Sequence, residues 1–198
     1  MHWHKRLLIG ALVVVALGAT AVTALGGTGG AGRHISANPL HKAEVVHLGL
    51  TPSSPQLAQC MPGAHLDVAV ALTTEQIGGD IFQITARHLP PNRDYTIFLL
   101  EQAGSPFGAA EYIGDFTTDK YGYAHNALKL IVQEGFSSTL VNGSRVRVDL
   151  NRVGVWFADP AADDFCLGAG SPVTPFDGDN EAGVQAFNSA NADPLPAP

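Results

Sequence analysis

The sequence is short of charge, of cysteine and of long helical patterns. Charged residues make up 15% of the 198 residues, hydrophobic residues make up 45%, and there are two cysteines. This hydrophobic content excludes wholesale disorder and is enough for one folded core. The sequence has no C-x-x-C pair, which is the usual motif of thiol redox sites and of structural zinc sites, so neither kind of site is expected. No long segment has the period of an amphipathic helix.

Basic residues are absent from residue 159 to the C-terminus. Up to residue 155, eleven acidic and eleven basic residues cancel, so the net charge of −7 comes from the end of the chain. A nucleic-acid partner is not expected, because phosphate contacts require clustered Lys and Arg. The acidic end is either a solvated tail or a site for a cation or a basic partner. Its acidic residues are Asp159, Asp163, Asp164, Asp177, Asp179, Glu181 and Asp193.

Motifs for catalysis are also missing. The sequence has no G-x-S-x-G elbow, no P-loop and no dinucleotide-binding fingerprint. Asp163 and Asp164 are adjacent in a loop, and no pattern places them across a scissile bond as in glycosidases. No reaction class and no cofactor follow from the sequence.

The N-terminus has the pattern of an export signal. Residues 1–6 are basic, residues 7–25 carry no charge, and small residues suitable for cleavage occur at positions 19–24. We interpret residues 1–25 as an apolar leader helix, either a cleaved signal peptide or a retained membrane anchor. Both interpretations place the domain outside the cytoplasmic membrane, secreted or anchored, with membrane contact through this segment only. Residues 26–55 are expected to be a flexible linker, with a candidate edge strand at 43–50.

The remainder is typical of antiparallel β-strands. Residues 81–87 alternate apolar and polar side chains, and residues 95–100 are apolar on both faces, which suits a strand in the middle of a sheet. The pair Asn142-Gly143 is a strong hairpin signal. We predict an all-β, antiparallel two-sheet sandwich over residues 56–168, followed by an irregular acidic tail rich in Gly and Pro over residues 169–198. Further strands are predicted at 66–74, 111–117, 123–132, 145–150 and 153–158.

Two segments carry a resemblance to a known family. Residues 89–95 (L-P-P-N-R-D-Y) and 114–122 (G-D-F-T-T-D-K-Y-G) resemble the L-P-x-N-x-x-Y and G-x-F-T-T-D-x-x-G patterns of bacterial secreted immunoglobulin-like modules. The apolar leader and the glycine content are similar to those of actinobacterial exported proteins. The resemblance implies an immunoglobulin-like or transthyretin-like sandwich outside the cell. It implies no activity, because such modules have many roles.

The two cysteines bracket the predicted strands. In an exported chain, Cys60 and Cys166 are expected to form a disulfide. An even number of reversing strands would also return the chain to the end where it entered.

Two groups of residues are candidate metal ligands. His65, His88 and His125 lie at strand ends that fall on one end of the predicted sandwich, so they could bind zinc or copper. The alternative is three ordinary surface histidines. Asp177, Asp179 and Glu181 alternate around a glycine, as calcium ligands do, although the EF-hand pattern fails.

The sequence therefore predicts an exported, non-catalytic binding or structural module at the cell surface or in the envelope. Its partner would be an unidentified protein or envelope component. The alternative is a zinc, copper or calcium carrier or enzyme that uses the histidine end or the acidic tail.

Overall fold

The computed structural model describes residues 43–132, 135–175 and 181–196. Strands dominate these residues, and every pairing between them is antiparallel. The predicted antiparallel all-β fold is therefore confirmed. In chain order the elements are β1 (Glu44–Pro52), α1 (Pro55–Cys60), β2 (His65–Leu72), α2 (Thr74–Ile77), β3 (Asp80–Arg87), β4 (Asp94–Leu100), β5 (Ala110–Thr117), β6 (Ala124–Leu130), β7 (Phe136–Val141), β8 (Ser144–Asp149), β9 (Arg152–Phe157), η2 (Pro160–Asp163), α3 (Asp164–Leu167) and β10 (Gln185–Asn188).

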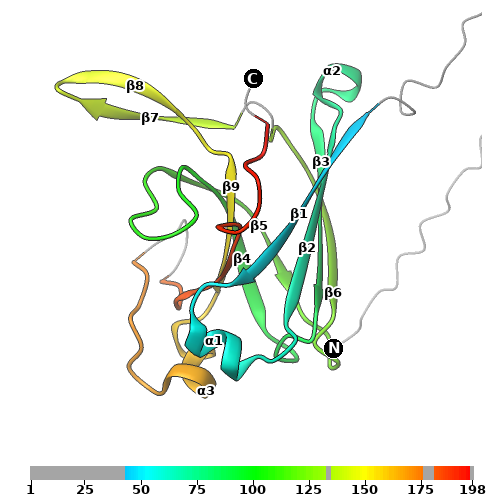
Figure 1. Ribbon diagram of the computed structural model, residues 1–198, viewed down its shortest axis with the longest axis vertical. Coiled ribbons are helices and arrows are strands. Elements are labelled where there is room, and N and C mark those ends of the chain that lie inside the picture. Colours follow the sequence, from blue (N-terminus) through cyan, green and yellow to red (C-terminus); the bar gives the residue numbers. More distant parts are fainter. Residues whose placement is uncertain (1–42, 133–134, 176–180, 197–198) are drawn as a thin grey trace, which may run out of the picture. The chain divides into compact units, whose positions relative to one another are not determined.

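Eight of these strands form one sheet in the order β5-β4-β9-β10-β1-β2-β3-β6 (Figure 1). The junction of β10 with β1 is narrow, because it consists of the pairs Thr51–Asn188 and Pro52–Phe187. The two end strands of this order approach each other, and Asn126 Nδ2 on β6 donates to the Asp115 carbonyl on β5 at 2.6 Å. The sheet is thus nearly closed, like a barrel. The prediction of two separate sheets is not confirmed, because β10 joins the two halves.

Strict alternation along β2 and β3 produces the main core. On both strands every second side chain is buried, and the residues between them face outward, as residues 81–87 predict. The core of this half is aliphatic and aromatic, so it is stabilised mainly by the burial of apolar area. The inward side chains are Leu66, Val68, Val70, Phe82, Ile84 and Ala86, each at most 1% exposed.

The hairpin β7–β8 forms a small sheet of its own (Figure 1). Its turn residues Asn142 and Gly143 both have positive φ, 50° and 81°. A two-residue type I′ turn requires that conformation at both positions, and Asn-Gly adopts it at least cost. The turn predicted from this dipeptide is confirmed.

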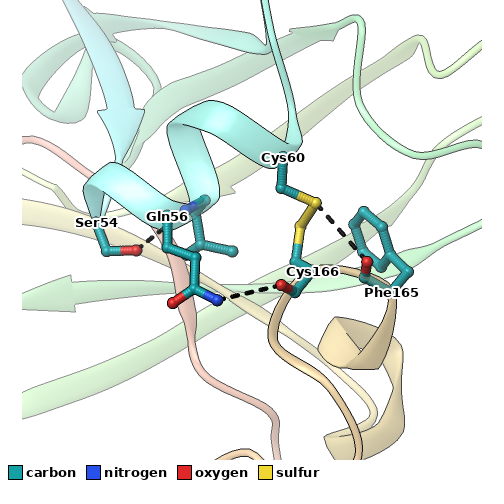
Figure 2. The surroundings of a disulfide bond; sticks show 6 residues. Ser54, Gln56, Cys60, Phe165 and Cys166 are labelled. Carbon is teal, nitrogen blue, oxygen red and sulfur yellow. Dashed lines mark hydrogen bonds between the residues drawn. A yellow bond between two sulfur atoms is a disulfide. The ribbon is translucent and has the colours of Figure 1, made fainter.

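The disulfide between Cys60 and Cys166 is present, with Cα atoms 5.6 Å apart, and it joins α1 to α3 (Figure 2). Helix α1 begins with Pro55, and Ser54 Oγ caps it by accepting from Leu57 N at 3.2 Å. Gln56 Nε2 also donates to the Cys166 carbonyl at 3.3 Å, beside the disulfide. The predicted pairing is confirmed.

The sheet includes strands on both sides of residues 56–168, the predicted range of the β domain. Strand β1 lies within the predicted linker of residues 26–55, and its residues 44–50 pair with β2. Strand β10 lies within the predicted tail of residues 169–198, yet it is inserted between β9 and β1. Its Ala186 and Phe187 are fully buried. A four-residue strand with polar ends has no sequence period of its own, so its neighbours decide its conformation.

The predicted leader helix lies outside the described residues. Among the helices that the structure describes, none is long and apolar enough to cross a membrane.

Candidate functional site: an apolar pocket beside β4 and β9

A second apolar cluster lies on the face of β4 and β9 that points away from the main core. Along β4, Ile97 and Leu99 belong to the main core, whereas Phe98 and Leu100 belong to this second cluster. Trp156 of β9 joins them, and Thr96 of β4 is its cross-strand partner. Residues 95–100 are therefore apolar on both faces because each face packs against a different cluster.

Gly154 makes room for the Trp156 indole. A Cβ atom on Gly154 would lie 2.5 Å from Trp156 Cζ3 and 2.7 Å from Leu100 Cδ1. Both distances are well inside van der Waals contact, so the indole occupies the space above Gly154 that a side chain would take. Trp156 is only 3% exposed as a result.

The connection between β4 and β5, residues 101–109, folds beside this indole. Glu101 and Ala109 close its base, because Glu101 N donates to Ala109 O and Ala109 N donates to Glu101 Oε2, both at 2.9 Å. Gln185 Nε2 of β10 donates to the Ala103 carbonyl at 2.9 Å and ties the loop to the sheet. Phe107 then sits edge-to-face with Trp156, with ring centroids 5.0 Å apart.

The facing wall comes from the C-terminal region. Thr174 and Ala182 exchange two backbone hydrogen bonds of 2.8 and 3.0 Å, and Thr174 Oγ1 donates to the Gly183 carbonyl at 2.8 Å. The Thr174 hydroxyl proton is therefore already used within the protein.

Together these elements line an apolar pocket of about 140 Å³ that is open on one side. Its principal lining residues are Phe98, Leu100, Phe107, Trp156, Thr174 and Ala182. A cavity of about 150 Å³ lined by apolar side chains is large enough for one benzene ring. Trp156 Nε1 is buried and has no hydrogen-bond partner among the residues that the structure describes. The site is therefore a ring-sized space with an almost wholly apolar lining.

The structure does not bring the three predicted histidine ligands together. They do lie at one end of the sheet, because His65 pairs with Arg87, next to His88, and Ala86 pairs with Ala124, next to His125. Each ring, however, has its own contact: His65 Nε2 with Asp67 Oδ1 at 2.8 Å, His88 Nδ1 with the Gly63 carbonyl at 3.2 Å, and His125 Nδ1 with Thr85 Oγ1 at 3.1 Å. Within the described ranges, no three His, Cys, Asp or Glu side chains are grouped so that they could hold a metal ion.

The predicted calcium ligands are only partly described. Asp177 and Asp179 lie outside the described residues. Glu181 is exposed and borders a shallow depression with Asp159 and Pro160.

Two buried carboxylates, those of Asp80 and Asp163, accept hydrogen bonds from backbone N–H groups and so hold neighbouring segments of the chain in place. Asp80 Oδ1 accepts from Thr73 N and Thr74 N at 2.8 and 3.0 Å, and its Oδ2 accepts from Val132 N at 2.9 Å. Asp163 Oδ2 accepts from Val184 N at 2.9 Å and so fixes the segment that leads into β10. A carboxylate that accepts backbone N–H groups in this way stabilises chain reversals.

The pocket residues were not singled out from the sequence. The one available signal was that residues 95–100 are apolar on both faces, which indicates a second packed surface. Which loops cover that surface depends on contacts between residues far apart in the chain.

No protein-family model, curated protein or solved structure matches the chain.

Proposed function

We propose that the protein is an exported, non-catalytic binding domain of the cell surface or envelope, and that the pocket beside β4 and β9 is its binding site. The observation that carries the proposal is a ring-sized apolar pocket lined by the aromatic side chains of Phe98, Phe107 and Trp156. Apolar pockets with a few polar groups are the usual form of small-ligand sites.

Export is supported by the N-terminal sequence and by the disulfide. Disulfides persist in oxidising compartments, and Cys60–Cys166 closes a separation of 106 residues. The immunoglobulin-like two-sheet architecture is part of the same proposal. It is supported by the two four-stranded halves β6-β3-β2-β1 and β10-β9-β4-β5, which share a junction of two residue pairs.

The tryptophan content of the chain offers a direct test. The sequence contains two tryptophans, Trp3 and Trp156, so the full chain with Trp3→Phe has its only indole in the pocket. Titration with toluene should give a saturable change in the intensity and position of the indole emission, because toluene displaces water from the open side of the pocket.

A matched pair of variants locates the binding. Ala110 is exposed and lines the pocket, so Ala110→Phe should fill the space from its rim and abolish the titration. Ala127 is exposed on β6 and does not line the pocket, so Ala127→Phe should leave it unchanged. No saturable response to toluene, or the same response in both variants, would refute the pocket as a binding site.

A further inference from the structure

Three aromatic rings line the pocket beside β4 and β9. Trp156 stands at 80° to Phe98 and at 75° to Phe107, with ring centroids 5.1 and 5.0 Å apart. The π-system of an aromatic ring carries partial negative charge on its faces, and the attraction for a cation is strongest for tryptophan. A group of such rings around one space therefore attracts a positive charge as well as an apolar group.

A carboxylate without a cationic partner adjoins this pocket. Glu101 is half-buried, and its Oε2 accepts from Ala109 N at 2.9 Å. A Cβ atom on Gly108 would lie 2.7 Å from Glu101 Cδ, so the carboxylate packs directly against Gly108, which lines the pocket. Among the residues that the structure describes, none forms an ion pair with Glu101. Because burial of a carboxylate is costly without an opposite charge, Glu101 would stabilise a positive charge in the pocket.

The lining itself carries no opposing charge. Each of its described residues is uncharged. Arg152 pairs with Leu100 across β4 and β9, but its guanidinium donates to the Ala192 carbonyl at 2.7 Å, and Arg152 does not line the pocket. The local charge that Glu101 supplies is therefore negative.

The same lining restricts which cation the pocket can take. Ammonium and guanidinium groups carry N–H donors that need acceptors when they leave water. Apart from Thr174, no described side chain of the lining carries an acceptor. A quaternary ammonium group has methyl groups in place of N–H donors, so it needs no acceptor. Its trimethylammonium head is also similar in size to a benzene ring, which suits a pocket of about 140 Å³.

Resting on the proposed function, we infer that the pocket binds the trimethylammonium group of a quaternary ammonium ligand. The methyl groups contact the rings of Phe98, Phe107 and Trp156, and Glu101 supplies the opposite charge. The remainder of the ligand leaves through the open side of the pocket.

Choline and 3,3-dimethylbutan-1-ol make a matched pair of probes, because they have the same shape and differ in a positively charged nitrogen against a neutral carbon. Both are titrated into the full-length, uniformly 15N-labelled protein at constant ionic strength. Affinities are taken from the backbone amide signals of Gly108 and Ala110. Choline should bind about five- to thirtyfold more tightly, the range expected for a cation held against aromatic rings. A site that is only apolar would give the opposite order, because the cation would lose its hydration without compensation.

A pair of variants tests the role of the carboxylate. Glu101→Gln keeps an acceptor for Ala109 N and removes the charge, so it should weaken choline binding about three- to tenfold and leave 3,3-dimethylbutan-1-ol unchanged. Glu75 is exposed on α2 and does not line the pocket. Glu75→Gln removes the same charge from the chain and should leave both affinities unchanged.

The outcomes separate the inference from the proposed function. If the neutral alcohol binds as tightly as choline or more tightly, the quaternary ammonium inference is overturned, and the pocket is still a binding site. Equal effects of Glu101→Gln and Glu75→Gln on choline would also overturn it. If neither these probes nor toluene shift the Gly108 and Ala110 signals, the proposed site and the inference fail together.

Discussion

Tyr95 carries a hydroxyl group that the core would be more stable without. The side chain is fully buried in β4, and its ring stacks on Phe116 with centroids 5.0 Å apart. Its hydroxyl has no hydrogen-bond partner among residues 43–132, 135–175 and 181–196. An unbonded buried polar group costs about 1–3 kcal/mol. Removing the oxygen leaves a void of roughly 15 Å³, which costs about 0.4 kcal/mol at about 24 cal/mol per Å³. Tyr95→Phe should therefore raise the free energy of unfolding by about 1 kcal/mol at neutral pH.

The same hydroxyl should make the protein sensitive to alkali. Burial raises the pKa of Tyr95 well above its ordinary value of 10.0, and the nearby Arg93 charge opposes this only in part. Above pH 10.0 the unfolded chain therefore loses this proton while the folded chain keeps it. Below that pH the ionisation of Tyr95 does not change the free energy of unfolding. Above it, the free energy of unfolding falls by about 1.4 kcal/mol per pH unit, until the pKa of Tyr95 in the folded chain is reached.

Urea denaturation followed by circular dichroism tests both statements, at neutral pH and at a pH of about 11. Tyr121→Phe is the control, since Tyr121 is 76% exposed and should behave as wild type at both pH values. Tyr95→Phe should be more stable than wild type at neutral pH, and the difference should grow by about 1.4 kcal/mol at the higher pH. A less stable Tyr95→Phe variant, or a difference that does not change with pH, would refute the reasoning.

Three further perturbations test the fold. Replacing Cys60 and Cys166 by serine should lower the free energy of unfolding by about 4–5 kcal/mol, measured in urea, and added reductant should then have no further effect. Phe187→Ala should cost about 3–5 kcal/mol, because Phe187 is fully buried in β10; a near-neutral effect would mean that β10 is not part of the core. Gly154→Ala should cost about 1–3 kcal/mol through overpacking, whereas Gly104→Ala, which meets open space, should not; thermal unfolding of the two variants compares them.

The alternation of apolar and polar residues was sufficient to predict the regular strands. Residues 81–87 alternate because one side of β3 is buried and the other is solvated, and this relation is local. The turn at Asn142-Gly143 is local in the same sense, because the conformation depends on those two residues. The disulfide was predictable for a different reason, since two cysteines permit one intramolecular pairing.

Strand β10 and the histidines show where that reasoning ends. Gln185 to Asn188 has too few residues for a period, and its strand conformation depends on hydrogen bonds to β9 and β1. For the histidines, strand direction placed His65, His88 and His125 at one end of the sheet. Whether three imidazoles converge depends on side-chain directions and on nearer partners such as Asp67 and Thr85.

The sequence by itself determined the positions of regular strands such as β2 and β3, the turn at Asn142-Gly143, the cysteine pairing and the apolar character of both faces of residues 95–100. Only the tertiary structure decided that the sheet nearly closes through β10 and that a pocket exists beside Trp156. The physical reason is the separation along the chain of the residues that interact. Strand period and turn conformation are fixed by neighbours in the chain, whereas the pocket needs Phe98, Phe107, Trp156 and Ala182 from four separate segments to meet in one place.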